Sequence, residues 1–318
     1  MREHTFVNED RVSLLALLRI PGVSWHFVAR EASRPDGLDR LLVGAAEERS
    51  REAVDSITLI SDRLGRLPLL RDEAAEIVQT ASDGGIGLTT VLDDDYPLNL
   101  RTIFNLPPFL FYRGTLRADD VRAVAVVGTR EPTELGLERA RRMARLLAEQ
   151  EPSVTVLSGL ARGIDTAAHE ATLEAPGRTV AVLGSGIRRI YPPENTPLAE
   201  AIAERGGAVV SQFWPDAPPS GRYTFALRNA VMSGMGQGTV VVEASATSGA
   251  RMQARLALGH GKKVWLLRSL VDERAWAKKY VDRGAVPIDG VEEIAQDLES
   301  AETLRERAGT RSQLALSL

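Results

Sequence analysis

The sequence predicts an α/β protein: an extended Rossmann-like, doubly wound parallel sheet with a small N-terminal helical domain. Two observations carry this prediction. Between residues 122 and 267, six short runs rich in Val, Ala and Leu alternate with helical stretches, and continuous apolar strands of this kind are typical of a parallel sheet covered on both faces. Before residue 84, by contrast, the apolar residues recur with the spacing of helices.

The N-terminal part is expected to be helical over residues 12–20, 25–32 and from 38 to 42, and then on to about residue 81. Pro21-Gly22 and Arg34-Pro-Asp-Gly37 separate the first three helices. A helix, a Pro-Gly turn and a second helix also occur in DNA-contacting helix-hairpin-helix elements, although Ser24 stands where that hairpin normally has a second glycine. The sequence thus predicts an N-terminal helical domain of the SAM or helix-hairpin-helix kind over residues 1–84. Two roles stay open for it, a structural helical cap and a DNA-contacting hairpin.

From residue 87 the pattern changes to that of a sheet. Short strands are expected near residues 89–92 and 109–112, followed by main strands near 122–127, 154–157, 179–183, 207–210, 238–243 and 263–267. Because crossovers between parallel strands are right-handed, the sheet is expected to be doubly wound and to bind ligands at the carboxyl ends of its strands. This core is predicted over residues 85–295, and residues 296–318 are predicted to form a C-terminal helix or tail.

The composition excludes several classes of protein. A chain of 318 residues, 44% hydrophobic and 26% charged, can bury one large core and a smaller second one. The absence of cysteine excludes disulfides, a thiolate nucleophile and Cys-ligated zinc, and four scattered histidines disfavour an all-His metal site. No apolar run approaches eighteen residues and the first ten residues lack the apolar centre of a signal peptide, which predicts a cytoplasmic protein without a membrane partner.

Positive charge is concentrated in one part of the chain. The formal net charge is −4, but residues 122–268 hold 18 Lys and Arg against 13 Asp and Glu, a net charge of +5, and the rest of the chain holds 21 against 30. Arginines on helix faces, as in Glu138-Arg-Ala-Arg-Arg-Met-Ala-Arg145, usually serve solubility. The arginines that follow predicted strands, at positions 130, 162, 188 and 189, are instead candidates for binding.

Glycines, small polar residues and arginines follow three successive predicted strands, in the segments 124–130, 156–165 and 182–192. Backbone N–H groups, a helix N-terminus and guanidinium groups that meet at one sheet edge bind phosphate. Arg130, for example, follows Gly128 and Thr129 closely enough for one phosphate to contact all three. The predicted phosphate-binding residues at these strand ends are Gly128, Thr129, Arg130, Ser158, Gly159, Arg162, Gly163, Gly184, Gly186 and Arg188.

Known cofactor and hydrolase motifs do not fit. Gly184-Ser-Gly186 has Arg189 where a dinucleotide fingerprint needs its third glycine, and no acidic residue follows the next strand. Gly261-Lys262 is followed by Lys263 and precedes a strand, so it is not a P-loop. No G-x-S-x-G elbow occurs. The sequence therefore predicts no cofactor and no enzymatic activity.

The order and spacing of short motifs from about residue 12 to about residue 295 resemble the DprA (Smf) family of DNA-processing proteins. The motifs are Asp95-Tyr-Pro97, Pro107-Pro108, Tyr112-Arg-Gly114, Gly128-Thr-Arg130, Ser158-Gly-Leu-Ala-Arg-Gly-Ile-Asp165, His169, Gly184, Tyr191-Pro-Pro-Glu-Asn195, Arg228-Asn229, Val242-Glu-Ala244 and Ser248-Gly249. The resemblance implies a homodimer that needs no cofactor, binds and protects single-stranded DNA, and helps to load RecA during recombination or natural transformation in competence. It adds to the predicted DNA-binding residues Asn195, Arg228, Asn229, Ser248 and Gly249.

Single-stranded nucleic acid is held by neutralised phosphates and by bases stacked on aromatic rings, each stack being worth roughly 1–3 kcal/mol. Tyr191, three residues after Arg188, and Phe225 are the predicted stacking platforms. Either ring can equally be a core residue that fixes its Pro-rich turn, and both readings stay open.

Two departures from the family pattern are visible. Leu227-Arg-Asn-Ala230 replaces an Arg-Arg-Asn-Arg run, which predicts weaker DNA binding, and Leu266-Leu-Arg-Ser269 replaces a Pro-Gly turn. Arg283-Gly-Ala285 and Gly290-Val-Glu-Glu-Ile294 still resemble the closing strand and helix of the family. The 24 residues after Ile294 leave no room for the C-terminal winged-helix domain of some members, so a divergent member without that domain is expected.

Two other functions stay open. In cytokinin-activating phosphoribohydrolases a Gly-Gly-x-Gly-Thr-x-x-Glu motif holds a nucleotide and places a catalytic glutamate, and Gly238-Thr-Val-Val-Val-Glu243 resembles it with the glutamate one residue late. The alternatives are therefore a non-catalytic nucleotide sensor, as in phage defence, and a nucleotide N-glycosidase. We expect Glu243 to be a structural acid that bonds the helix start at Ser248-Gly249. Asp165 and His169, four residues apart, are likewise expected to form a structural hydrogen bond or helix cap.

Overall fold

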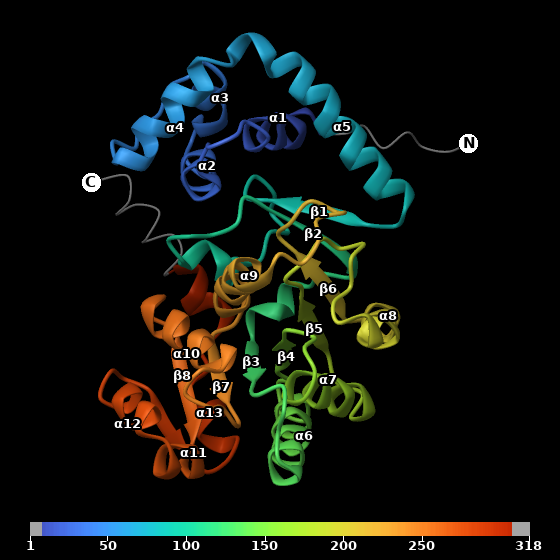
Figure 1. Cartoon of the computed structure of the whole chain (residues 1–318), viewed down its shortest axis with the longest axis vertical. Coiled ribbons are helices and arrows are strands. Elements are labelled where there is room, and N and C mark those ends of the chain that lie inside the picture. Colours follow the sequence, from blue (N-terminus) through green and yellow to red (C-terminus); the bar gives the residue numbers. More distant parts are fainter. Residues whose placement is uncertain (1–7, 307–318) are drawn as a thin grey trace. The chain divides into compact units, whose positions relative to one another are not determined.

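Strands and helices alternate along most of the chain, and the computed structural model in Figure 1 describes them over residues 8–306. The described chain divides into two compact units. One comprises the residues up to Tyr96 together with Phe104–Phe111, and the other comprises Pro97–Ile103 together with the residues from Tyr112 onward. Each unit buries its own set of apolar side chains.

The first unit is helical, as predicted, and adds strand structure at its end. Its helices and its first strand are α1 (Glu9–Leu18), α2 (Trp25–Ala32), α3 (Gly37–Leu42), α4 (Arg51–Ser61), α5 (Leu67–Asp83) and β1 (Gly87–Thr90). Ser24 caps α2, because its hydroxyl accepts the N–H of Phe27 at 3.2 Å. The cap gives a structural reason for a serine, and not a second hairpin glycine, after the Pro21-Gly22 turn.

The core of the first unit forms where α1 packs against α2, α3 and α5. Leu14, Leu17, Phe27 and Leu41 are completely buried there. The unit also takes in residues 85–96 and 104–111, so it extends past the predicted domain boundary at residue 84.

The second unit contains a seven-stranded run of parallel strands in the order β6-β5-β4-β3-β7-β8-β9. The strands are β3 (Ala123–Val127), β4 (Thr155–Ser158), β5 (Thr179–Val182), β6 (Ala208–Ser211), β7 (Gly238–Val241), β8 (Lys263–Leu267) and β9 (Val286–Ile288). The residues of β3 to β7 are all buried, as expected for strands covered on both faces.

Helices cover both faces of these strands (Figure 1). On one face lie α6 (Glu134–Ala148), α7 (Ile164–Glu174) and α8 (Thr196–Glu204), and on the other lie α9 (Gly221–Met235) and α10 (Gly249–Gly259). Strand β3 has β4 on one side and β7 on the other, so the strand order reverses at β3. Doubly wound sheets bind ligands beyond the carboxyl ends of the strands at such a reversal.

The fold prediction is confirmed, because each predicted strand is present with its ends shifted by no more than two residues. After β8 the chain forms α11 (Arg268–Glu273), α12 (Ala275–Val281), β9 and α13 (Glu292–Asp297). Strand β9 and α13 are the expected closing strand and helix. Of the predicted tail over residues 296–318, residues 301–306 are helical, and residues 307–318 lie outside the described residues. Among residues 8–306, no helix is both long and apolar enough to cross a membrane.

Candidate nucleic-acid interface

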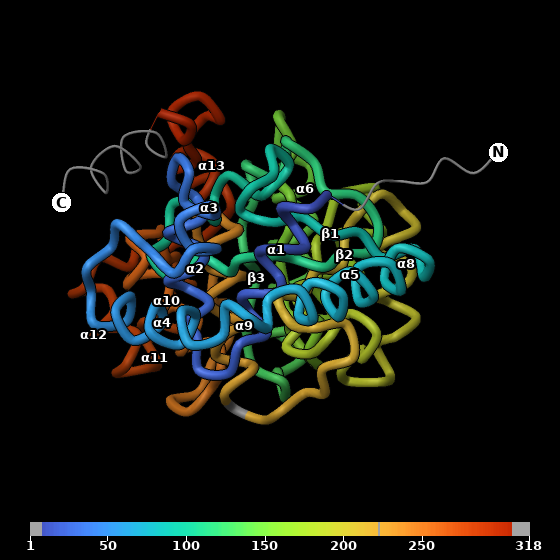
Figure 2. Tube along the Cα trace, turned by 90° about the horizontal axis from the view of Figure 1, so that it is seen from above, coloured from blue at the N-terminus to red at the C-terminus, as the bar shows by residue number. Residues whose placement is uncertain are grey.

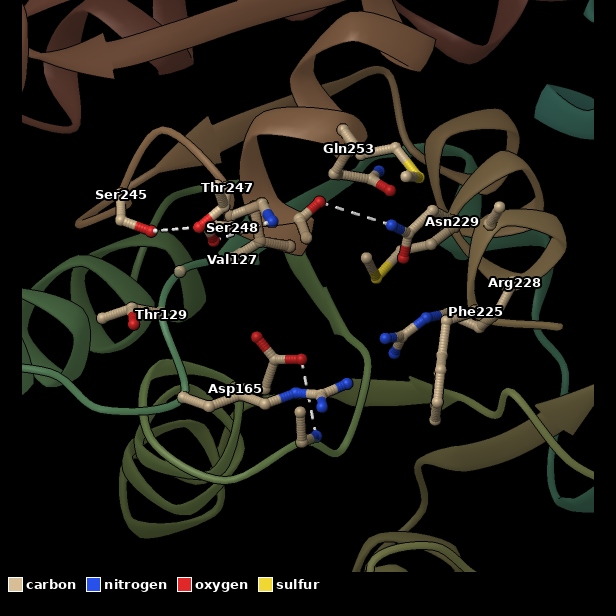
Figure 3. Close-up of a pocket in the computed structure, with 18 of the residues that line it drawn as sticks. Val127, Thr129, Asp165, Phe225, Arg228, Asn229, Ser245, Thr247, Ser248 and Gln253 are labelled. Atoms are coloured by element: carbon tan, nitrogen blue, oxygen red, sulfur yellow. Dashed lines mark hydrogen bonds between the residues drawn. The ribbon is translucent and has the colours of Figure 1, made fainter. Parts of the chain in front are cut away.

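A pocket of about 770 Å³ opens beyond the carboxyl ends of β3, β4 and β7, and Figure 3 shows the side chains around it. An adjoining hollow of about 40 Å³ shares four residues with this pocket. Together the two hollows are lined by eleven of the predicted residues, namely Gly128, Thr129, Arg130, Gly159, Arg162, Tyr191, Phe225, Arg228, Asn229, Ser248 and Gly249. The other six predicted residues lie outside both linings.

The loop after β3 presents Arg130 to the pocket. Gly128 has no room for a side chain, because an added Cβ would lie 2.3 Å from Ile164 Cγ1 on α7. The Thr129 N–H donates to the carbonyl of Glu243 at 2.7 Å, and the Thr129 hydroxyl accepts the N–H of Glu131 at 3.2 Å. Arg130 itself is exposed, and within the described part of the chain it forms no ion pair. The loop is therefore fixed while its guanidinium group stays available to a ligand.

Phe225 on α9 lines both hollows. The Arg130 guanidinium lies 5.1 Å from the centre of the Phe225 ring, and the Arg228 guanidinium lies 5.9 Å from it. The Tyr191 ring is 5.9 Å from the same ring at a tilt of 46°, and 43% of Tyr191 is exposed. Gly184, just after β5, leaves room for the Phe225 ring, because an added Cβ at this position would lie 2.7 Å from Cδ1 of the ring.

Arg228 differs from the expectation of a DNA-contacting arginine. Only 6% of it is exposed, and its Nη1 donates to the carbonyl of Val182 at 3.3 Å. It extends from α9 toward the loop of Asp165 (Figure 3), and Gly159 makes room for it, since an added Cβ there would lie 1.4 Å from Nη1 and 2.8 Å from Asp165 Oδ2. Burial lowers the pKa of Arg228 and raises that of Asp165. The attraction between the two opposite charges acts against both of these pKa shifts. Arg228 is thus an internal cation beneath Phe225.

Two further predicted arginines are held in surface ion pairs. Arg162 bonds Glu194, and Arg188 Nη1 lies 2.8 Å from Asp216 Oδ2. Exposed pairs of this kind contribute little stability and exchange readily with solvent or a ligand. Arg189 is exposed and, in residues 8–306, makes no ion pair.

Several predicted polar residues serve the protein interior instead of the pocket surface. The buried Ser158 hydroxyl donates to the carbonyl of Val126 at 2.7 Å. Asn195 is buried and donates to the carbonyl of Leu160 at 2.8 Å and to the Thr166 hydroxyl at 2.9 Å. Gly163 adopts φ +80° just before α7, and Gly186 packs against the backbone of residues 214 and 215. These residues shape the loops that carry the exposed side chains.

The start of α10 forms the opposite wall. The Ser248 hydroxyl caps the helix by accepting the N–H of Ala250 at 3.1 Å, and Gly249 is exposed with open space where a side chain would be. Asn229 Nδ2 donates to the Gly249 carbonyl at 3.4 Å. The positive end of the helix dipole thus faces the same pocket as Arg130.

The structural role expected for Glu243 exists, but at a different helix. Its carboxylate accepts the hydroxyl of Thr133 at 2.8 Å and the Thr133 N–H at 3.3 Å, at the start of α6 and not of α10. Glu243, held at this N-cap, does not line the pocket. A glycosidase would need its catalytic carboxylate there.

With this geometry in view, the relatives of the chain are informative. The model of the family described as DNA recombination-mediator protein A matches residues 87–299, more than half of the chain. The chain belongs to this family. Similar curated members are protein Smf of Escherichia coli, 38% identical over 206 residues, and DNA processing protein DprA of Bacillus subtilis, 32% identical over 217 residues. These matches cover 64% and 67% of this chain, and 54% and 72% of the two relatives.

Two solved structures of DprA proteins have a similar fold. The X-ray structure of the Streptococcus pneumoniae protein matches with a TM-score of 0.73 and 26% identity, covering 91% of this chain and 98% of that one. The Helicobacter pylori protein, described for its single-stranded DNA binding mode, matches with a TM-score of 0.57 and 24% identity over 70% of this chain and 96% of that one. The chain therefore covers almost the full length of these two structures, whereas it spans about half the length of the E. coli relative.

In this family member, Asp165 and His169 do not bond each other, contrary to one of the two expected arrangements. Asp165 Oδ2 accepts the N–H groups of Gly159 at 3.2 Å and Ala161 at 3.4 Å, which holds the loop before α7. His169 is completely buried with its Nδ1 2.7 Å from the Thr179 hydroxyl, which itself donates to the carbonyl of Val156. Because that hydroxyl proton is used, Nδ1 of His169 carries the proton. Both residues are structural.

The buried imidazole predicts acid sensitivity of this DprA-type core. Burial, aided by the charge of Arg228, lowers the pKa of His169 from 6.5 to about 3. As the pH falls, His169 therefore takes up its proton in the unfolded chain at a higher pH than in the folded protein. The contribution of neutral His169 to the free energy of unfolding is present above pH 6.5 and is lost as the pH falls toward 3. Urea unfolding should yield about 1.4 kcal/mol less stability near pH 5.5 than near pH 7.5 from this group. His169→Gln should flatten that difference; an equal pH dependence in the variant would contradict the assignment.

Several pocket residues carried no signal in the sequence. Ser245 and Thr247 lie in the loop before α10, while Met232, Met252 and Gln253 lie on the helices that meet there. Short polar loop residues and single methionines on helices are common in any protein, and only the packing of α9 on α10 shows that they face the pocket.

Proposed function

We propose that this family member binds single-stranded DNA in the pocket beyond β3, β4 and β7, without catalysing a reaction. The observation that carries the proposal is the group formed by Arg130, Phe225 and Tyr191: an exposed cation with no ion pair in the described residues, set against two neighbouring rings. A guanidinium group fits a phosphate and exposed rings fit unpaired bases, which is the combination that single strands require. The H. pylori protein described for its single-stranded DNA binding mode has the same fold.

The test is a titration of fluorescent oligo(dT) at several salt concentrations. If Arg130, Arg162, Arg188 and Arg189 each neutralise one phosphate, the logarithm of the binding constant should fall with the logarithm of salt with a slope of about −3. Duplex DNA should compete poorly, because the bases must be free to stack. Absence of oligo(dT) binding at low salt would refute the proposal.

A second candidate function follows from the size of the pocket. A volume of about 770 Å³ and the start of α10 in its wall also suit a mononucleotide, so a non-catalytic nucleotide sensor remains the alternative. A sensor would ignore oligo(dT) and gain thermal stability from a mononucleotide. Since Glu243 is bound to the start of α6, we do not propose the N-glycosidase.

Tyr191→Ala measures the stacking contribution directly. The ring is exposed and close to Phe225, so one base stack should be lost, at about 1 kcal/mol or roughly fivefold in affinity for oligo(dT). Tyr191→Phe is the matched control and should bind like the parent protein. Equal affinities of the alanine and parent proteins would mean that Tyr191 only fixes its loop.

Membership of the family supports a proposal about the wider role. We propose that the protein acts as a homodimer in the cytoplasm, protects single strands from nucleases and helps RecA to assemble on them during recombination or transformation. Light scattering measures the oligomeric state, and the rate of RecA assembly on strands coated with a single-strand binding protein measures loading. A monomer in solution, or an unchanged RecA rate, would remove that part of the proposal.

A further inference from the structure

Two of the arginines that we assign to the single strand are each bonded to a carboxylate of the protein itself. Arg162, which lines the smaller hollow, bonds Glu194, and Arg188 Nη1 lies 2.8 Å from Asp216 Oδ2. We call Glu194 and Asp216 the rim acids. Both are exposed. A carboxylate and a phosphate offer similar oxygen atoms to a guanidinium group, so the rim acids occupy places that DNA phosphates would take.

The loops around the first pair are held together without it. Arg162 lies in the loop before α7, and Glu194 lies in the turn before α8. Buried Asn195 joins the same two segments, because its amide donates to the carbonyl of Leu160 at 2.8 Å and to the hydroxyl of Thr166 at 2.9 Å. The Arg162 and Glu194 side chains can therefore separate while both loops stay in place.

The second pair has the same kind of independent support. Between α8 and α9 the chain passes through β6 and the loop that carries Asp216 (Figure 2). The N–H of Gly186 donates to the carbonyl of Ala217 at 2.8 Å, and the N–H of Arg188 donates to the carbonyl of Pro215 at 2.9 Å. These backbone bonds fix the two loops to each other. The ion pair is again an addition that the loop structure does not require.

Both members of the first pair are charged at neutral pH. Its hydrogen bond lowers the pKa of Glu194 and raises the pKa of Arg162. A phosphate that binds Arg162 must therefore displace a charged carboxylate, which then lies close to the strand and repels it. Arg130 has no such competitor, since it makes no ion pair with any residue from 8 to 306.

We propose that the rim acids are internal competitors of the DNA phosphates, which a strand bound at Arg130 displaces from Arg162 and Arg188. The inference rests on the proposed function of the pocket. Once Arg130 holds one phosphate, the neighbouring phosphates of the same strand reach the paired arginines at high effective concentration. When the strand leaves, the rim acids take the arginines back. They lower the affinity of the site and keep the bound strand exchangeable.

The test is the double variant Glu194→Gln and Asp216→Asn, which keeps the size of both side chains and removes their charges. It should bind oligo(dT) about tenfold more tightly than the parent protein, at roughly threefold for each exposed pair that no longer has to be broken. The salt slope should stay at about −3, because the same phosphates are contacted.

The matched control is the double variant Glu170→Gln and Glu200→Gln. It removes the same net charge from exposed positions on α7 and α8, and neither glutamate makes an ion pair in the described part of the chain. Its affinity for oligo(dT) should equal that of the parent protein. An equal gain in affinity by both double variants would overturn the inference, since net charge alone would then explain it.

The remaining outcomes separate the two proposals. A parent protein that does not bind oligo(dT) refutes the pocket proposal. If the parent protein binds and the rim-acid variant binds equally or more weakly, the inference is overturned. A steeper salt slope in that variant also overturns it, because Arg162 and Arg188 would then have contacted no phosphate in the parent protein. Should the double variant fail to fold, Glu194→Gln and Asp216→Asn alone should each tighten binding about threefold, and no gain in either overturns the inference.

Discussion

Arg130→Ala is expected to weaken oligo(dT) binding by about 10- to 100-fold. A hydrogen bond between charged groups is worth about 1.5–3 kcal/mol, and the Arg130 guanidinium is exposed, held over Phe225 and engaged in no ion pair within the described residues. Because its guanidinium group contacts the Phe225 ring but forms no ion pair within the described residues, the melting temperature should change by no more than a few degrees. Fluorescence anisotropy at one fixed salt concentration measures the first effect, and thermal unfolding the second.

Two variants calibrate this result. Arg130→Lys keeps the charge but lacks the planar fork, so its affinity should lie between those of the parent and the alanine variant. Arg141→Ala removes an exposed arginine from α6 and should leave the affinity unchanged. Equal binding by the parent and Arg130→Ala would exclude a phosphate contact at this position and, with it, the main support for the pocket.

Arg228→Ala is expected to lower the free energy of unfolding by about 3–5 kcal/mol, through the fold and not through DNA contact. Arg228 and Asp165 are both buried and their opposite charges attract each other, although they form no direct ion pair, so removing Arg228 leaves the acid uncompensated. Here the remaining charge is Asp165, whose pKa burial already raises and whose carboxylate the Arg228 charge stabilises. The truncation also opens a cavity under the Phe225 ring. Urea unfolding measures the loss.

A double variant tests whether the charge of Asp165 is the cause. Asp165→Asn removes the orphaned charge while an amide oxygen can still accept the N–H groups of Gly159 and Ala161. Combined with Arg228→Ala, it should restore part of the lost stability, so the two changes together should cost less than the sum of the single ones. Strict additivity would show that the two side chains act independently.

The fold could be predicted from the sequence because its signals are local. A buried parallel strand needs four to six consecutive apolar residues, and β3 to β8 carry such runs with helical spacing between them. Loop glycines mark the carboxyl ends of the strands, and doubly wound topology places those ends at one edge. The position of the pocket follows from these two facts.

The state of each arginine at that edge could not be predicted, because partners come from distant segments. Arg162 pairs with Glu194 from the turn before α8, and Arg228 lies close enough to Asp165 for their opposite charges to interact. Spacing along the chain predicts which backbone atoms share an edge, but burial and ion pairing depend on side-chain packing. Glu243 illustrates the same limit, since both α6 and α10 begin near β7 and only the structure shows which one it caps.

The fit of Gly159 against Arg228 constrains the order in which this protein can evolve. An alanine at position 159 would place its methyl group on the guanidinium, so the Arg228 side chain would have to move unless position 228 had first become smaller. If position 159 changed first, the intermediate protein would have its Arg228 guanidinium group displaced. Glycine at position 159 is therefore favoured wherever the arginine is retained, and we expect the two positions to vary together.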